Sequence, residues 1–156
     1  MSYLLLKYLH IMGACVLFGT GLGIAFFMFS AVRTKDVQAI AATSQIVVKA
    51  DYLFTLTAAL IQPLTGALLV WQAGYEFLDL WIAVSLALYI IIGLCWIPVV
   101  FMQIEMAKLA QSSANNESTL PTRFFQLYRR WFILGWPAFI SMLTIFALMI
   151  FKPVSF

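Results

Sequence analysis

Residues 80–102, LWIAVSLALYIIIGLCWIPVVFM, decide the fold, because this stretch contains no charged side chain. A helix of this length extends about 35 Å, which is enough to cross the roughly 30 Å hydrocarbon core of a bilayer. The run Leu86–Ile92 is apolar at successive positions, whereas the strands of a transmembrane barrel alternate apolar and polar side chains. The stretch therefore predicts a transmembrane helix.

Three other stretches have the same character, and they run from about residue 3 to 32, 51 to 73 and 131 to 151. Of the 156 residues, 64% are apolar and only 10% are charged, whereas about a quarter of a soluble domain is charged. This composition excludes water-soluble enzymes, nucleic-acid-binding proteins and disordered proteins. We expect an all-α, polytopic membrane protein. A single domain, residues 1–156, would form a bundle of four transmembrane helices in a lipid bilayer, with no nucleic-acid partner.

Basic residues are concentrated after the first and third spans, whereas the connection 74–79 carries only acidic charges, from Glu76 and Asp79. Positive charges favour the cytoplasmic side of a membrane. We therefore expect a multi-pass membrane protein with its basic side in the cytoplasm and both termini outside. Seven of the nine basic residues support this orientation: Arg33, Lys35, Lys49, Lys108, Arg123, Arg129 and Arg130.

The segments between the spans predict further helix. Residues 34–50 contain no glycine or proline, so we expect the second helix to begin near Asp36 and to continue inward as one rod. The third helix should extend through Lys108, and 112–121 should be the linker. Glycines in the first span predict close helix approach, and three prolines predict kinks. These residues are Gly19 and Gly23, and Pro63, Pro98 and Pro137.

Two expectations concern the basic side of the bundle. Asp51 begins the second span, and Arg129 and Arg130 begin the fourth, so we expect a salt bridge across the bundle. Trp96 and Trp131 fall at the depth where an interfacial aromatic belt should lie.

His10, the only histidine, lies about two turns inside the first span, and Lys7 precedes it by one turn. An ionisable side chain inside a membrane is costly and marks a functional site by default. A neutral imidazole can ligate haem iron or another metal and can relay protons, while Lys7 could pair with a haem propionate. Three roles stay open for His10: a hydrogen bond to a neighbouring carbonyl, ligation of haem or metal, and a proton or quinone role.

A single histidine excludes ligation of a haem by two histidines of the same chain. The second axial ligand would be Met142 or Met149, a histidine of a second subunit in a homo-oligomer, or an open position. Gln62 falls close to the level of His10, where it would donate to a quinone oxygen or satisfy the backbone opened by Pro63.

Several motifs resemble known families. LKYLHI (6–11) with Phe18-Gly19, and LYRR (127–130) continuing through Pro137 to FKP (151–153), resemble the first and last helices of HemJ-type protoporphyrinogen oxidases. Almost the whole chain resembles a bacterial family of predicted integral membrane proteins of unknown function, itself distantly similar to HemJ and to CopD-type copper-resistance proteins. The motifs are KADY (49–52), QPLTG (62–66), CWIPVV (95–100) with Gln103, and GWPAF (135–139).

The resemblance implies a four-helix protein of the bacterial inner (plasma) membrane, with both termini on the periplasmic side, that binds haem b through His10, assisted by Lys7. The chain departs from the HemJ family because its third span has no histidine, and LGWP (134–137) replaces an Asn-Glu-Pro run. The resemblance thus implies haem binding without protoporphyrinogen oxidation. We expect a redox-linked haem b protein and, if it is an enzyme, a haem-dependent membrane oxidoreductase. The alternatives are a non-enzymatic subunit or assembly partner of a larger membrane complex, and a copper or small-solute transport component.

Overall fold

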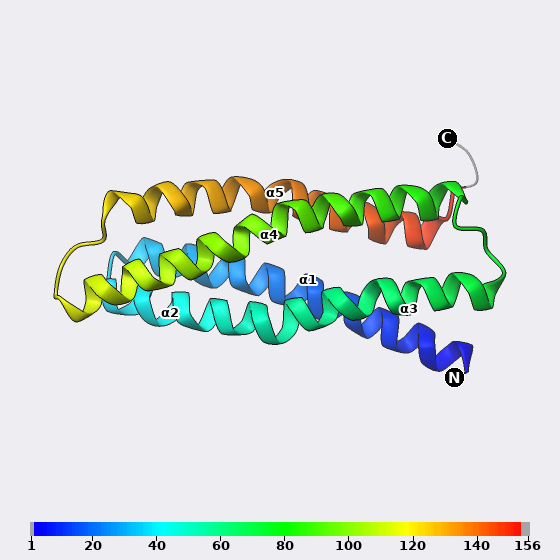
Figure 1. Ribbon diagram of the computed structural model, residues 1–156, viewed down its shortest axis with the longest axis horizontal. Helices are drawn as coiled ribbons and strands as arrows, with labels where there is room; N and C mark the ends of the chain where they lie inside the picture. The colour runs from blue at the N-terminus through cyan, green and yellow to red at the C-terminus, as the bar shows by residue number, and fades with distance from the viewer. Residues whose placement is uncertain (1, 154–156) are drawn as a thin grey trace.

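The computed structural model describes residues 2–153, which form helices joined by short connections, with no strand in that range (Figure 1). The four long helices expected from the sequence are present, and each has the length and apolar composition needed to cross a membrane. The second of them is one continuous rod of three consecutive segments. The elements are α1 (Tyr3–Thr34), α2 (Val37–Ala50), the π-helix η1 (Asp51–Leu56), α3 (Thr57–Ala73), α4 (Leu80–Asn115) and α5 (Thr122–Phe151).

Local signals explain where the helices begin and end. The Ser2 side chain accepts a hydrogen bond from the Leu5 amide, and the Asp36 side chain accepts one from the Gln38 amide, so both residues cap helix N-termini. Gly74 ends α3 at a φ of 72°, which glycine adopts without strain. The prediction that the second helix begins near Asp36 and runs as one rod is confirmed.

The predicted linker was too long at its first end. Residues 112–115 are helical, so α4 ends at Asn115, and α5 begins at Thr122 directly after Pro121. The 36 residues of α4 span about 54 Å, well beyond the roughly 30 Å of a hydrocarbon core. The bundle therefore projects out of the membrane. We call the end that holds residues 35–36 and 116–121 the basic end. The end that holds the start of α1, the end of α5 and residues 74–79 is called the terminal end (Figure 1).

The helices pack in a defined order, in which α1 contacts α2 and α3, while α4 contacts α2 and α5. The larger hydrophobic core lies toward the basic end, where alanines of α2 and α4 meet larger side chains of α1 and α5. Its buried members are Ile24, Met28, Ala31, Ile40, Ala41, Val47, Met106, Ala110, Ala114, Phe124, Leu127 and Trp131. A smaller core of Trp81, Ile82 and Leu148 lies toward the terminal end.

Polar contacts join the helices outside these cores. At the terminal end, the Lys152 ammonium donates to the Tyr75 hydroxyl at 3.0 Å and lies over the ring of Trp81. Toward the basic end, the Arg123 guanidinium donates to both carboxylate oxygens of Glu105, which joins α5 to α4.

One packing expectation, the close helix approach at Gly19 and Gly23, needs correction. A Cβ built on Gly19 would meet no atom within 4 Å, and one built on Gly23 would meet only Phe27 of the same helix. These glycines therefore do not mediate close packing between helices of this chain. Helices α3, α4 and α5 are continuous across Pro63, Pro98 and Pro137, because each proline removes one backbone hydrogen bond and the surrounding turns hold the helix together. The kinks expected at these prolines stay a prediction.

Candidate functional site

The His10 imidazole is held between α1 and α3. Its Nδ1 lies 2.8 Å from the hydroxyl oxygen of Thr65, which is buried on α3. The same hydroxyl donates to the carbonyl oxygens of Ile61 at 3.0 Å and Gln62 at 3.1 Å. His10 is half-buried, so the α1–α3 contact restricts the ring without enclosing it.

The Thr65 hydroxyl couples the tautomer of His10 to the direction of its own proton. A hydroxyl carries one proton, and three acceptors lie within its reach: the carbonyl oxygens of Ile61 and Gln62 and Nδ1 of His10. When the proton bonds a carbonyl, the hydroxyl oxygen accepts from Nδ1–H and the lone pair of the imidazole is on Nε2. Metal-ligating histidines have this arrangement, because their second ring N–H donates to a neighbouring acceptor.

Small residues allow α1 and α3 to approach at this point. A Cβ on Gly66 would lie 3.3 Å from Cε1 of His10, so the imidazole packs directly on the backbone of α3. One turn further in, a Cβ on Gly13 would lie 3.1 Å from Oε1 of Gln62. That oxygen is buried and has no hydrogen-bond partner. Gln62 thus lies at the same helix contact as His10.

The other candidate ligands lie at different depths. Lys7 is exposed, one turn from His10 toward the terminal end. Phe18 stacks on Phe139 of α5 and contacts Phe146, so Met142 lies at the level of Phe18. That level is eight residues, or about 12 Å, inward from His10. Met149 is exposed on the last turns of α5, closer to the level of His10.

Pro63 leaves one backbone carbonyl of α3 without its helical hydrogen bond, and a residue other than Gln62 donates to that carbonyl. Proline has no N–H, so the carbonyl of Ala59, four residues earlier, loses its usual helical partner. The Tyr89 hydroxyl of α4 donates to this oxygen at 2.6 Å. Tyr89 therefore repairs the break in α3 and ties α3 to α4.

Asp51 forms the second polar centre of the bundle, at the first residue of η1, and its side chain is 4% exposed. The Trp96 indole N–H lies 3.2 Å from Oδ1 and 3.1 Å from Oδ2. The Gln103 amide is best oriented with its nitrogen 3.1 Å from Oδ2 and its oxygen 3.1 Å from the Trp131 indole nitrogen. Every one of these partners donates toward Asp51, directly or through Gln103.

This network corrects two expectations. Asp51 does not pair with Arg129 or Arg130, both of which are exposed, and the ion pair within residues 2–153 joins Arg123 to Glu105. Trp96 and Trp131 point into the bundle as hydrogen-bond donors and are not belt residues. Sequence reasoning missed the network, although an acidic residue in a span and indoles at its depth were visible signals.

A cavity of about 350 Å³ adjoins this centre, with lining residues from α1, η1, α3, α4 and α5. The cavity borders the larger hydrophobic core, since Ile24 and Trp131 belong both to that core and to the cavity lining. Asp51, Thr55, Tyr89 and Gln103 supply polar groups to a lining that is otherwise almost entirely apolar. Met142 also lines this cavity, whereas His10, Lys7, Gln62 and Met149 do not.

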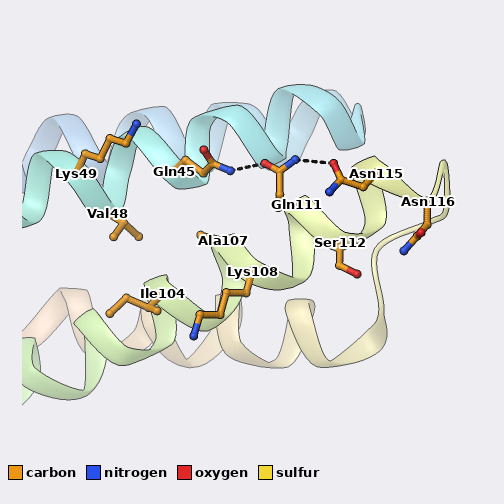
Figure 2. Close-up of a pocket in the computed structure, with 10 residues that line it drawn as sticks. All are labelled: Gln45, Val48, Lys49, Ile104, Ala107, Lys108, Gln111, Ser112, Asn115 and Asn116. Carbon is orange, nitrogen blue, oxygen red and sulfur yellow. Dashed lines mark hydrogen bonds between the residues drawn. The ribbon is translucent and has the colours of Figure 1, made fainter.

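A wider groove of about 660 Å³ lies between α2 and α4 toward the basic end (Figure 2). Gln45 of α2 donates to Gln111 of α4, and Gln111 donates to Asn115 at 2.8 Å, so a row of amides closes one side. The lining residues are Gln45, Val48, Lys49, Ile104, Ala107, Lys108, Gln111, Ser112, Asn115 and Asn116. Within residues 2–153, no three His, Cys, Asp or Glu side chains lie together as a metal site.

A family model for predicted integral membrane proteins, DUF2269, matches residues 4–153. The chain belongs to this family. The match covers all four long helices together with both polar centres, and the family description assigns no function beyond residence in the membrane. No curated protein and no solved structure matches the chain significantly.

Proposed function

We propose that this membrane protein binds haem b, with His10 as axial ligand through Nε2, and takes part in a redox process. The observation that carries the proposal is the hydrogen bond between Nδ1 of His10 and the Thr65 hydroxyl. In the tautomer with a proton on Nδ1, this bond leaves Nε2 unprotonated and oriented, on a group that is costly to keep in a membrane.

The residues around His10 fit this role by their donor chemistry. Lys7 is exposed one turn toward the terminal end, where a propionate carboxylate could pair with its ammonium group. Met149 of the same chain or a histidine of a second copy would hold the haem from the other side, or that position would stay open; Met142 lies too deep for this role. Haem b would supply a one-electron redox centre in the half of the membrane nearer the terminal end.

The proposal includes an orientation and an electron partner. The basic end faces the cytoplasm of a bacterial cell, so the termini and His10 lie toward the outside of the inner membrane. A quinone is the electron partner consistent with this depth, and the unpartnered oxygen of Gln62 beside Gly13 would accept a hydrogen bond from a quinol hydroxyl.

Absorption spectroscopy on the full chain, purified in mild detergent from haem-replete cells, tests the proposal. We expect a Soret band and a reduced-minus-oxidised α band in the wild type and their loss in His10→Ala. Thr65→Val should weaken haem binding by about 10- to 100-fold, because the acceptor for Nδ1–H is removed. Lys7→Ala should retain haem with lower affinity, while Lys49→Ala, at the basic end, should match the wild type.

A folded but colourless wild-type preparation contradicts haem binding. That result would favour the second candidate, a non-enzymatic subunit or assembly partner of a larger membrane complex. The groove of Figure 2 supports that candidate, because its amide and lysine side chains lie beyond the apolar spans and can bind a polar partner surface. A copper or small-solute transport role is the third alternative.

A further inference from the structure

The cavity of about 350 Å³ beside Asp51, which we call the central cavity, has an apolar, aromatic wall and one buried acidic group. Its lining includes Phe18, Trp96, Trp131, Trp136 and Phe139. Ligand sites in proteins are cavities of about 300–1,000 Å³ with mostly apolar walls and few polar groups, and the 350 Å³ of this cavity falls in that range. The wall chemistry therefore suits a ligand with an apolar body.

The acidic group of the cavity, Asp51, has no cationic side chain beside it among the described lining residues. The hydrogen-bond partners of Asp51, Trp96 and Gln103, are neutral donors, which suits an ionised acceptor. Among the described residues that line the cavity there is no lysine, arginine or histidine. A buried negative charge in a membrane is costly unless a cation accompanies it. The cavity therefore lacks the positive charge that would balance Asp51.

Two further features mark this position as a binding site. The Thr55 hydroxyl lines the cavity one turn after Asp51 and is 9% exposed, and it lies beside the Asp51 carboxyl without a hydrogen bond of good geometry. A ligand group placed against Asp51 would therefore also reach a buried hydroxyl that has hydrogen-bonding capacity to spare. In addition, the π-helix η1 begins at Asp51, and π-helical turns inside α-helices are frequent at functional sites.

We propose that the central cavity binds a lipophilic organic cation, an ammonium group on an apolar body, with its charge against Asp51. The aromatic side chains of the wall pack against the apolar body of the ligand. A small metal ion would need several oxygen ligands, which this lining does not supply. The cavity reaches the lipid-facing surface, because its lining residues Leu22, Phe132 and Trp136 are exposed, so the ligand enters from the bilayer.

Binding of a matched pair of probes to the purified full chain in detergent tests the proposal. Benzyltrimethylammonium carries the charge, and neopentylbenzene has the same shape with carbon in place of nitrogen. Quenching of tryptophan fluorescence should give at least tenfold tighter binding of the cation than of the neutral isostere. In a Gly93→Leu variant the new side chain fills open cavity space, so this variant should bind neither probe. The fluorescence change that it still shows measures the uptake of the probes by detergent micelles.

The variant Asp51→Asn keeps an acceptor oxygen for Trp96 while it removes the charge. It should bind the two probes equally, whereas Glu117→Gln, which removes an exposed carboxylate outside the cavity, should keep the wild-type preference. Equal binding of both probes to the wild type overturns the proposal, as does an Asp51→Asn protein that retains the preference. If Asp51→Asn fails to fold, the proposal is tested by the preference of the wild type for the cation over the neutral probe and by the loss of that preference in Gly93→Leu. His10 takes no part in this site, so failure here is distinct from failure of haem binding.

Discussion

At the scale of single residues, the structure satisfies polar groups inside the membrane by pairing them across helices. Pro63 opens the Ala59 carbonyl of α3, and Tyr89 of α4 closes it at 2.6 Å. Thr65 links its own backbone to His10 in the same way. In a bilayer such groups have no water to bind, so each pairing also fixes the relative position of two helices.

Tyr89→Phe should lower the free energy of unfolding by about 1 kcal/mol, because the Ala59 carbonyl is left without a partner. In a Pro63→Ala background the new N–H of residue 63 can bond that carbonyl, so the same change should cost less than half as much. Unfolding of the four proteins by SDS in mixed micelles measures this coupling as a double-mutant cycle. Equal costs in both backgrounds would refute the role assigned to Tyr89.

At the scale of elements, small side chains bring α2 and α4 together beyond the membrane. Ala41 of α2 and Ala110 of α4 are almost fully buried in the larger core, between Met28 of α1 and Phe124 of α5. Alanine combines high helix propensity with little volume, so the same residues favour helix and permit close packing. This explains why residues 37–50 continue the second span as a rod.

Ala110→Leu should destabilise the protein by about 1–3 kcal/mol, because its position has no space for a larger side chain. Ala42→Leu is the matched control, since Ala42 is exposed on α2 and the same change there should alter stability by less than about 0.5 kcal/mol. Thermal unfolding followed by circular dichroism compares the two. Similar melting temperatures for both variants would mean that the α2–α4 contact is looser than described.

The positions of the helices in the chain could be predicted from the sequence more completely than the side-chain contacts between the helices. The rod from Asp36 follows from the absence of glycine and proline, a property of neighbouring residues. The end of α4 was missed because Ser112 and Asn115 have low helix propensity, which the packing of Ser113 and Ala114 overrides. The partners of Asp51 depend on how helices are rotated about their axes, and a uniformly apolar span carries no periodic signal that sets this rotation.

At the scale of the whole molecule, charge divides the bundle into two unlike ends. The basic end carries Arg33, Lys35 and Lys108 with four further cations, and the connection 74–79 at the terminal end carries acids. Transfer of the basic end across a membrane would require moving these charges through the hydrocarbon core, which is unfavourable. The basic end should therefore remain in the cytoplasm, with both termini, Tyr75 and Lys152 on the other side.

Single cysteines introduced at the two ends test this orientation. Both variants are made in a background with Cys15→Ser and Cys95→Ser. In cells whose outer barrier is permeabilised and whose inner membrane is intact, Glu76→Cys should react with a membrane-impermeant maleimide. Asn116→Cys should react only after the inner membrane is lysed, because it would lie on the cytoplasmic side. Glu76 and Asn116 are both exposed on their connections, so a difference in labelling reports the side of the membrane on which each lies. The opposite pattern would place His10 nearer the cytoplasm, so a haem bound as proposed would have to exchange electrons from that side. Labelling of both positions in intact cells would mean that the charge asymmetry does not determine a single orientation.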